Sequence, residues 1–275
     1  MKKITISCSI VLYKNDKSIQ ATIKCVLSSN IPVFLYLIDN SSKDNLRIDL
    51  GQFINLPNVK YIFNGKNIGF GAAHNIALKE VVKFSDYHIV LNPDVLFDEN
   101  VFKDIFEYAK TDRNIGLIMP KVLNPDRTIQ YLCKLLPTPS DLLIRRIPFF
   151  SKFFRQDNFE LRFTCYNKIM EVPFLSGCFM FLQTECLQKV GYFDENFFMY
   201  AEDIDFCRRI HKKYKTIFYP EISVVHGYAK GSYKNIKLFI IHFISIIKYF
   251  NKWGWFVDKE RETINARTLQ KLLNN

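Results

Sequence analysis

The sequence lacks several signatures that assign a function directly. Its seven cysteines form no CxxC pair, which disfavours zinc ribbons and thioredoxin-like redox sites. An odd number of cysteines without a regular spacing instead indicates reduced thiols, as in a cytosolic protein. The glycine-rich loop is not followed by GK[ST], so it is not a Walker-type phosphate loop. No serine or cysteine has a GxSxG context, so nothing indicates nucleophilic catalysis.

Long hydrophobic runs are also missing. The longest uncharged stretch near the C-terminus, residues 238–247, is far shorter than the ~20 residues that a membrane-spanning helix needs. The N-terminus, MKKITISCSIVLY, begins like a signal peptide but has no small-residue cleavage site, and its alternating β-branched residues indicate a strand. There is no internal repeat. We therefore expect a cytoplasmic protein.

The composition is that of a globular protein with acidic partners. The 275 residues are 48% apolar and 24% charged, enough for one large α/β domain or two ordinary ones. The formal net charge of +11 makes the phosphates of a nucleotide, anionic lipid headgroups or nucleic acid plausible ligands.

Strands and helices alternate in the first half of the chain. The continuous apolar runs predict strands that are buried on both faces, and helices between them predict a mostly parallel, doubly wound α/β sheet with helices on both sides. The predicted strands are residues 4–13, 33–39, 58–64 and 87–92, and the predicted helices are residues 17–29, 72–84 and 98–110.

The pattern is less regular after about residue 120. We expect a short strand pair in residues 121–136 and an irregular basic and aromatic stretch in residues 137–162. A strand in residues 171–183, an amphipathic helix in residues 200–214 and one or two short strands in residues 215–227 should follow. The chain then reads as helical to its end. The predicted division is a domain of residues 1–234 and a C-terminal helical extension of residues 235–275.

Three polar segments follow predicted strands: Asp39, the loop NIGFGAAHN (67–75), and Asp94 in LNPDV. Each taken alone can be a turn. In an open α/β sheet the carboxyl ends of neighbouring strands converge on one crevice, so the three segments are predicted to face each other. Gly69 and Gly71 could bring the backbone close to a ligand before a helix whose N-terminus favours phosphate, or could only shape a turn.

Two later segments carry candidate chemistry. In YAEDIDFCRRI, Asp205 has the spacing to pair with Arg208 or Arg209, but the preceding acids at 202 and 203 follow an aromatic run. A carboxylate among aromatic and apolar groups has a raised proton affinity, which suits a general base. His226 ends the strand SVVH; a lone histidine is more often structural, but the glycine and lysines after it favour an anion or metal site.

The order of these features resembles a known family. SIVLY, IDNSS, NIGFGAAHN, LNPDV, FLSGCFMFLQ, VGYFDENFFMYAEDIDFCRRI and VVHGYAKGS together resemble the family 2 inverting glycosyltransferases of bacterial surface polysaccharide synthesis, which have the GT-A fold. Within that family the chain looks most like rhamnosyltransferases that use dTDP-rhamnose. The resemblance covers roughly residues 4–230.

The resemblance implies a role for each candidate residue. Asp94 would hold Mg²⁺ or Mn²⁺ on the donor diphosphate, with His226 as a further metal or diphosphate contact. Asp203 would be the base that deprotonates the acceptor hydroxyl, and Glu202 would orient the acceptor or that base. The residues implied to contact the donor nucleotide and its diphosphate are Tyr13, Asp39, Asn67, Gly69, Gly71, Asn75 and Asn92.

One residue departs from the family pattern. Asn92 stands where the broader family has the first carboxylate of Asp-x-Asp, a form that the rhamnosyltransferase-like branch shares. A single carboxylate should bind a metal more weakly, so the metal requirement is expected to be less strict.

The implied reaction is transfer of L-rhamnose from dTDP-rhamnose to a hydroxyl of a surface-polysaccharide or lipid-linked glycan, by metal-assisted direct displacement. A UDP- or GDP-sugar donor is the alternative. A sugar-nucleotide pyrophosphorylase would need a glycine- and arginine-rich loop where this chain has YKNDKS. A non-enzymatic membrane or nucleic-acid binder would leave the acids at 94, 202 and 203 unexplained, and no nucleic-acid partner is expected.

Two basic, aromatic segments are candidates for membrane contact. Residues 142–156 and 236–256 mix Lys and Arg with Phe, Ile and Trp. Such segments either pack as helices on the domain or bind at a membrane interface. A lipid-linked acceptor would make the second useful, and peripheral attachment to the cytoplasmic face of the inner membrane is therefore expected.

Overall fold

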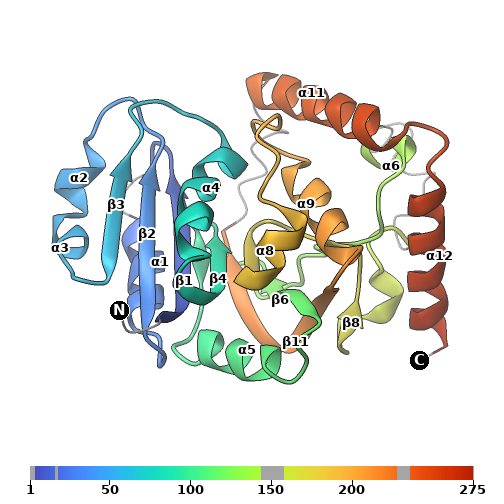
Figure 1. The fold of residues 1–275 in the computed structure, drawn as a ribbon, viewed down its shortest axis with the longest axis horizontal. Helices are drawn as coiled ribbons and strands as arrows, with labels where there is room; N and C mark the ends of the chain where they lie inside the picture. The colour runs from blue at the N-terminus through green and yellow to red at the C-terminus, as the bar shows by residue number, and fades with distance from the viewer. Residues whose placement is uncertain (1–3, 16–17, 144–157, 228–235, 275) are drawn as a thin grey trace.

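The computed structural model describes residues 4–15, 18–143, 158–227 and 236–274 (Figure 1). Its N-terminal half is a four-stranded parallel sheet in the order β3-β2-β1-β4. The strands are β1 (Ile4–Leu12), β2 (Val33–Asp39), β3 (Val59–Phe63) and β4 (Ser85–Leu91). The predicted strands of this half are confirmed.

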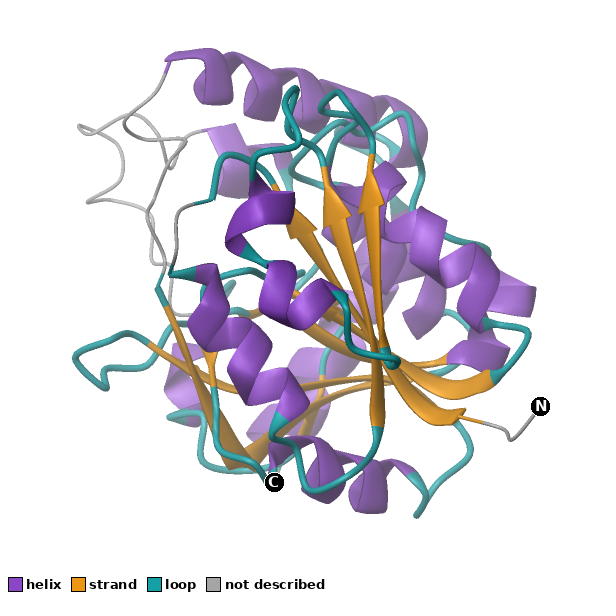
Figure 2. Ribbon diagram, turned by 90° about the vertical axis from the view of Figure 1, so that its left-hand side faces the viewer, coloured by secondary structure: helices purple, strands orange, loops and turns teal. Residues whose placement is uncertain are grey.

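Helices connect these strands and cover both faces of the sheet, as Figure 2 shows. The three predicted helices are confirmed with slightly shifted ends, as α1 (Ile19–Leu27), α4 (Phe70–Val81) and α5 (Val101–Ala109). Two helices of one turn each, α2 (Leu46–Asp49) and α3 (Gly51–Ile54), were not predicted, because four residues are too few for a hydrophobic periodicity. The doubly wound α/β architecture is confirmed.

The C-terminal half extends the same sheet with mixed directions. β10 is antiparallel to both β4 and β6, β11 is parallel to β6, and β5 and β8 pair with β11. β7 and β9 form a separate two-stranded sheet. The bounds are β5 (Val95–Leu96), β6 (Ile115–Leu123), β7 (Cys133–Lys134), β8 (Met170–Glu171), β9 (Phe174–Leu175), β10 (Phe179–Gln183) and β11 (Lys215–His226).

Two predictions for this half were wrong. The strand expected over residues 171–183 is three short strands, with a bend at Pro173 and a turn at Gly177–Cys178 between them. Strand β6 begins at Ile115, well before the expected strand pair, and its Gly116 and Pro120 are residues that rarely occur inside a central strand. Helix α8 (Thr184–Val190) was not predicted, whereas the predicted amphipathic helix is present as α9 (Glu202–His211). Two further helices, α6 (Pro139–Leu143) and the 3₁₀ helix η2 (Arg162–Thr164), are short.

A buried polar network lies inside the sheet core. The Ser9 hydroxyl oxygen lies 2.7 Å from His74 Nδ1 and 2.8 Å from His88 Nε2, and Ser7 Oγ lies 2.8 Å from His88 Nδ1. All four side chains are fully buried. Burial lowers the pKa of His88 to about 3, and burial with the neighbouring His88 lowers the pKa of His74 well below its usual value. Both rings are therefore neutral in the folded protein.

This network predicts acid sensitivity. Between pH 6.5 and pH 3 the unfolded chain binds a proton at His88 while the folded chain does not, so the free energy of unfolding falls as the pH falls through that window. We expect His88 alone to cost about 2–3 kcal/mol by pH 4.5. Urea unfolding at pH 7.5 and 4.5 measures this, with His88→Gln as reference because carboxylates contribute equally to both proteins. Equal pH-dependent losses in the two proteins would contradict the prediction.

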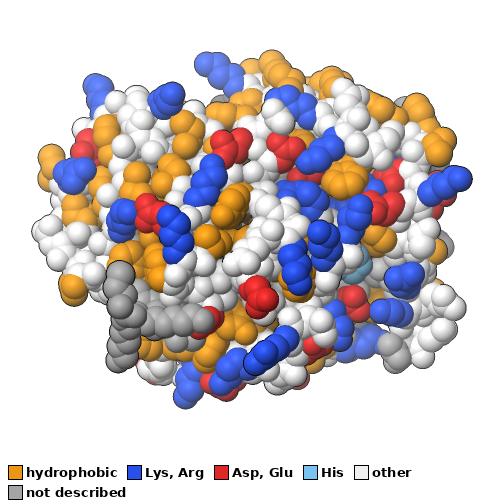
Figure 3. Space-filling view, in the orientation of Figure 1, with side chains coloured by type: hydrophobic (Ala, Val, Ile, Leu, Met, Phe, Trp, Pro, Cys, Tyr) orange, Lys and Arg blue, Asp and Glu red, His pale blue; other side chains and the backbone are white. Residues whose placement is uncertain are grey.

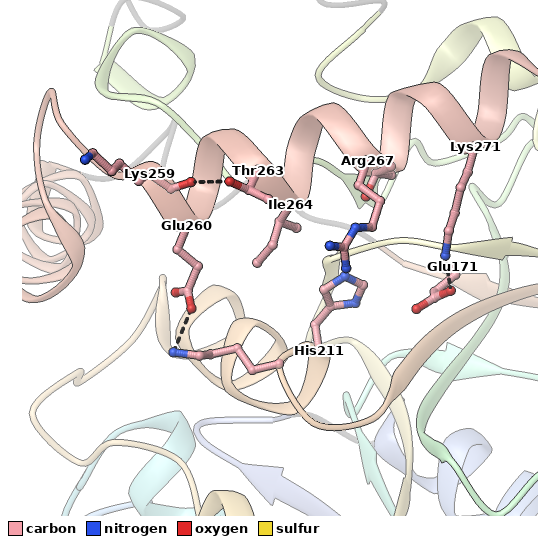
Figure 4. A pocket seen from close by; sticks show the side chains of 10 residues that line it. Glu171, His211, Lys259, Glu260, Thr263, Ile264, Arg267 and Lys271 are labelled. Atoms are coloured by element: carbon pink, nitrogen blue, oxygen red, sulfur yellow. Dashed lines mark hydrogen bonds and ion pairs between the residues drawn. The ribbon is translucent and has the colours of Figure 1, made fainter.

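The C-terminal helices α11 (Ile236–Trp253) and α12 (Lys259–Leu273) pack against α9. The buried Arg208 guanidinium donates two 2.7 Å hydrogen bonds to Asp258 and one of 2.8 Å to Glu260, and it lies 4.1 Å from the Trp253 ring centroid. Figure 4 shows the outer side of this contact, a polar cleft between α9, α12 and β8 in which Lys212 pairs with Glu260. These contacts bind the C-terminal helices closely to α9; the division at residue 234 stays a prediction.

Candidate active site

The first strands bring the nucleotide-side candidates to one edge of the sheet. Asp39, at the end of β2, is buried and accepts hydrogen bonds from the Ser41 N–H (2.8 Å) and the Tyr61 hydroxyl (2.7 Å). Tyr13 follows β1 and is 45% exposed. The Lys14 N–H donates to Ser41 Oγ, so the segment after β1 lies beside the segment after β2.

The glycine loop joins the same edge through Asn40, which sequence reasoning missed. Asn40 Nδ2 donates to the Gly69 carbonyl oxygen (3.0 Å) and to Asn67 Oδ1 (3.3 Å), and Asn67 Oδ1 also accepts from the Gly69 N–H. The predicted proximity of Asp39 and the loop is therefore confirmed. Asn40 directly follows Asp39, so its position after a strand was the signal that could have found it.

The two loop glycines are required by protein packing. A Cβ at Gly69, whose φ is +94°, would lie 2.3 Å from the Phe198 carbonyl oxygen, and a Cβ at Gly71 would lie 2.8 Å from Phe193 Cβ. The buried Asn75 amide exchanges hydrogen bonds with the Phe193 backbone. The loop is thus fixed to residues 193–198, which lead into α9. Nucleotide contacts by these loop residues stay a prediction.

The LNPDV segment meets His226 at the end of β11. Asp94 Oδ1 lies 3.3 Å from His226 Nε2, and Gly227 N–H donates to the Asp94 carbonyl oxygen. His226 Nδ1 donates to Gln130 Oε1 (3.1 Å), so in the neutral ring Nε2 presents its lone pair toward Asp94. Asn92 Nδ2 donates to that same Nε2 at 3.2 Å.

This arrangement fits a divalent cation. The Asp94 carboxylate and the His226 Nε2 lone pair are both acceptors, and a metal-binding histidine commonly donates its other N–H as His226 does to Gln130. Among the described residues no group of three or more His, Cys, Asp or Glu side chains could hold a metal. Two protein ligands completed by substrate phosphates are the usual arrangement for Mg²⁺. The His226 Nε2 lone pair accepts from Asn92 Nδ2 in this structure, so a cation bound there would replace that hydrogen bond.

The acidic pair begins helix α9. Asp203 Oδ2 accepts from the Gly177 N–H (3.0 Å) and Oδ1 from the Ile204 N–H (2.9 Å). Burial raises the pKa of Asp203, while these two N–H groups and the charge of Lys134 oppose that rise. Burial and then the Asp203 charge raise the pKa of Glu202 well above its usual value, and its buried Oε2 has no hydrogen-bond partner among the described residues.

The two acids therefore differ in protonation. Neighbouring buried carboxyls do not both ionise easily, and the proton stays on the one with fewer donors. Asp203 has the N–H donors, so it carries the charge and Glu202 carries the proton. A neutral Glu202 can donate a hydrogen bond to a bound hydroxyl.

A strained turn precedes Glu202 and Asp203 and sets where α9 begins. Tyr200 (φ +69°) and Ala201 (φ +64°) are consecutive non-glycine residues in the left-handed region, a conformation that costs energy and is concentrated at functional sites. The turn ends at the first residue of α9. Its strain is held by the Phe198 carbonyl contact with the glycine loop and by Ser245 Oγ of α11, which donates to the Met199 carbonyl oxygen at 2.8 Å.

Cys178 connects the two groups of acids. Its carbonyl oxygen accepts from the Asn92 N–H, and it follows Gly177, which donates to Asp203. Burial raises the pKa of the Cys178 thiol to about 12, with contributions from the charges of both Asp94 and Asp203. The Asp94–His226 pair and the Asp203 carboxylate thus both lie near Cys178. Sequence reasoning missed Gln130, Gly177 and Cys178, which no local pattern distinguishes.

Structural comparison defines the class of protein. The fold is the GT-A fold of nucleotide-sugar transferases. It is similar to GalNAc-T7 solved with UDP, GalNAc and Mn²⁺, with a TM-score of 0.60 at 18% identity, over 82% of this chain and 43% of that one. It is also similar to a Pyrobaculum calidifontis mannosyltransferase solved with GDP-Man and Mn²⁺, with a TM-score of 0.58 at 13% identity, over 100% of this chain and 76% of that one.

Sequence comparison gives the family. Residues 5–237 match the family model "Glycosyltransferase like family 2", and the chain belongs to this family. An N-acetylglucosaminyl-diphospho-decaprenol L-rhamnosyltransferase of Mycobacterium tuberculosis is 26% identical over 228 residues, 75% of this chain and 70% of that protein. The rhamnosyltransferase WbbL of Escherichia coli is 24% identical over 200 residues, which are 68% of this chain and 71% of that protein. A Haloferax volcanii hexosyltransferase of low-salt glycan biosynthesis is 25% identical over 210 residues, which are 76% of this chain and 62% of that protein.

Proposed function

We propose that the protein transfers L-rhamnose from dTDP-rhamnose to a hydroxyl of a lipid-linked or surface-polysaccharide glycan, with inversion at the anomeric carbon. The observation that carries the reaction is the Asp94–His226 pair, connected to the half-buried Asp203 carboxylate through Gly177, which donates to Asp203, and Cys178, which accepts from Asn92. The bacterial relatives named above support the donor sugar, and the mycobacterial relative's acceptor, a diphospho-decaprenol, supports a lipid-linked acceptor.

The donor side of the site has three parts. We propose that Tyr13 and Asp39 contact the nucleoside, and that Asn67 and the loop carrying Gly69 and Gly71 lie along the diphosphate. Asp94 and His226 would hold a divalent cation, Mg²⁺ or Mn²⁺, whose charge would neutralise the diphosphate leaving group. Asn75 and Asn92 act indirectly, because their side chains hold residue 193 and His226.

The acceptor side is the start of α9. The Asp203 carboxylate takes the proton of the acceptor hydroxyl as its oxygen attacks the anomeric carbon, and the bond from that carbon to the diphosphate oxygen breaks on the opposite face. Gly177 and Ile204 N–H groups fix the carboxylate, and its raised pKa strengthens it as a base. The protonated Glu202 donates to the acceptor and orients it.

The donor is tested by thermal unfolding with nucleotides and Mn²⁺. We expect saturating dTDP with Mn²⁺ to raise the melting temperature by roughly 5–10 °C, the shift of a ligand near 100 times its Kd. UDP and GDP should raise it less. In Asp94→Asn the increment that depends on Mn²⁺ should disappear, while Asp98→Asn, on the exposed loop after β5, serves as the matched control.

Other outcomes of this panel are informative. Stabilisation by UDP or GDP alone would replace the rhamnosyl donor by another nucleotide sugar, as bound in the structural relatives. An unchanged Mn²⁺ increment in Asp94→Asn would show that the residue shapes a turn and holds no cation.

We also propose that the protein attaches to the membrane that carries its acceptor. None of the helices in the described part of the chain is long and apolar enough to cross a bilayer. Attachment would therefore be peripheral, on the cytoplasmic face where nucleotide sugars are available. Of the two basic, aromatic segments, residues 144–156 lie outside the described residues, and residues 236–256 include α11.

A further inference from the structure

Helix α11 carries an exposed apolar stripe. Ile236, Ile240, Phe243 and Ile244 have exposed fractions of 71%, 50%, 45% and 46%. Their spacing of three and four residues puts them on one face of the helix. Figure 3 shows hydrophobic side chains along the edge of the molecule that α11 forms in Figure 1. Large exposed apolar surface of this kind marks an interaction site.

Packing on the domain accounts for only part of α11. Its buried residues are Ser245, Ile246, Tyr249 and Phe250, all in the C-terminal half of the helix. Ser245 is fixed by its hydrogen bond to Met199. Ile246 and Phe250 are three and seven residues after Phe243, so they continue the same apolar face, which is buried against the domain in the C-terminal half of α11 and exposed in its N-terminal half. A helix that leaves part of its apolar face exposed is typical of an interfacial helix.

The charge of the helix indicates what covers the stripe. IKLFIIHFISIIKYFNKW contains three lysines and no acidic residue, in a chain of net charge +11. Both tryptophans of the chain, Trp253 and Trp255, lie at its C-terminal end, followed by Phe256 and Val257 with exposed fractions of 83% and 76%. Lys252 pairs with Asp194 and Asp205, and the Trp253 ring packs on Arg208, so it is the exposed apolar residues and the net positive charge of the chain that favour an anionic bilayer surface.

The helix lies next to the proposed acceptor side of the site. The Tyr200 and His242 rings are 4.9 Å apart, and Tyr200 is two residues before Glu202. In Figure 2 α11 crosses the end of the molecule toward which the parallel strands point. We propose that α11 docks its apolar stripe on an anionic lipid bilayer and thereby presents the start of α9 to an acceptor held in that bilayer. The role of the acceptor rests on the proposed function; the docking itself does not.

Co-sedimentation of the full chain with vesicles tests the docking. We expect binding to vesicles of phosphatidylglycerol and phosphatidylethanolamine and weak binding to pure phosphatidylcholine. The double variant Ile240→Ser/Phe243→Ser should reduce partitioning at least about tenfold, because it removes apolar area from the stripe alone. Ile48→Ser/Leu56→Ser, which removes two exposed apolar residues at the opposite end of the molecule, should bind as the wild type does.

A second measurement needs no variant. Brominated lipid chains should quench the part of the wild-type fluorescence that comes from Trp255, which follows α11 and precedes the exposed Phe256, whereas Trp253 packs on Arg208. The proposal is overturned if the wild type does not bind anionic vesicles, if both double variants bind equally, or if bromolipids leave the fluorescence unchanged. It is also overturned if sedimentation velocity shows that the stripe forms a dimer that the α11 variant abolishes. No donor or acceptor is present, so these outcomes leave the proposed sugar transfer untouched.

Discussion

Asp203→Asn is expected to abolish sugar transfer while donor binding stays nearly intact. Loss of a general base costs typically 10²–10⁴-fold in rate, and the amide cannot accept the hydroxyl proton. The Gly177 and Ile204 N–H groups bond to different carboxylate oxygens, so the amide keeps one of these hydrogen bonds and turns its NH₂ group toward the other N–H. Turnover with a radiolabelled nucleotide sugar measures the first effect, and thermal stabilisation by the nucleotide measures the second.

Glu202→Gln is the matched variant for this experiment. Glu202 is already neutral because burial and Asp203 raise its pKa, so an amide of the same size keeps the charge state of the site. We expect a loss of roughly tenfold or less, the scale of one lost neutral hydrogen bond. Equal losses in the two variants, or unchanged turnover in Asp203→Asn, would remove Asp203 as the base.

Arg208→Met is expected to give the largest loss of stability. Removing one member of a buried ion pair leaves the other charge buried and unpaired, at a cost of about 3–5 kcal/mol. Asp258, the bidentate partner, is only 3% exposed. We expect the melting temperature to fall by roughly 10 °C. Because the pair joins α12 to α9, the loss should also loosen the helix that begins with Glu202 and Asp203.

Two further variants isolate the pair. Lys212→Met lies on the same helix and also pairs with Glu260, but its side chain is 42% exposed, so it should cost less than about 1 kcal/mol. In Arg208→Met, Asp258 keeps its longer ion pair with Arg261, at 3.9 Å; adding Asp258→Asn removes this poorly compensated charge and keeps the N-cap of α12, which accepts from the Arg261 N–H. The double variant should be more stable than Arg208→Met. Additive losses in urea unfolding would contradict a coupled pair.

The sequence predicted the regular half of the fold well for a physical reason. Strand β2 and the second half of β4 are buried and therefore consist of continuous apolar runs, which are followed closely by the polar residues Asp39 and Asp94. Parallel strands place such ends at one edge, so the proximity of Asp39 and the glycine loop followed from order alone. Strand β6 was found late because Gly116 and Pro120 weaken the pattern and pairing with β10 and β11 compensates.

The sequence could not distinguish equivalent partners. Asp205 had two arginines at suitable spacing. The structure pairs it with Arg209 at 2.9 Å, and Arg208 turns to Asp258, 50 residues away. Helical spacing places both arginines near Asp205, and only the position of α12 decides between them. The reason for Gly69 is likewise visible only in the tertiary structure, because its lack of a side chain makes room for the Phe198 backbone.

By itself the sequence determined the class of fold, the family and the residues that carry charge at the ends of strands. These follow from short-range rules: periodicity, turn chemistry and the order of motifs. The tertiary structure alone decided how those charges act. It gave Asp94 a histidine partner oriented by Gln130. It left Glu202 Oε2 buried without a hydrogen-bond partner among the described residues, while Asp203 received two N–H donors. It also exposed the apolar residues in the N-terminal half of α11. Protonation and exposure depend on which distant segments meet, and that information is not local in the chain.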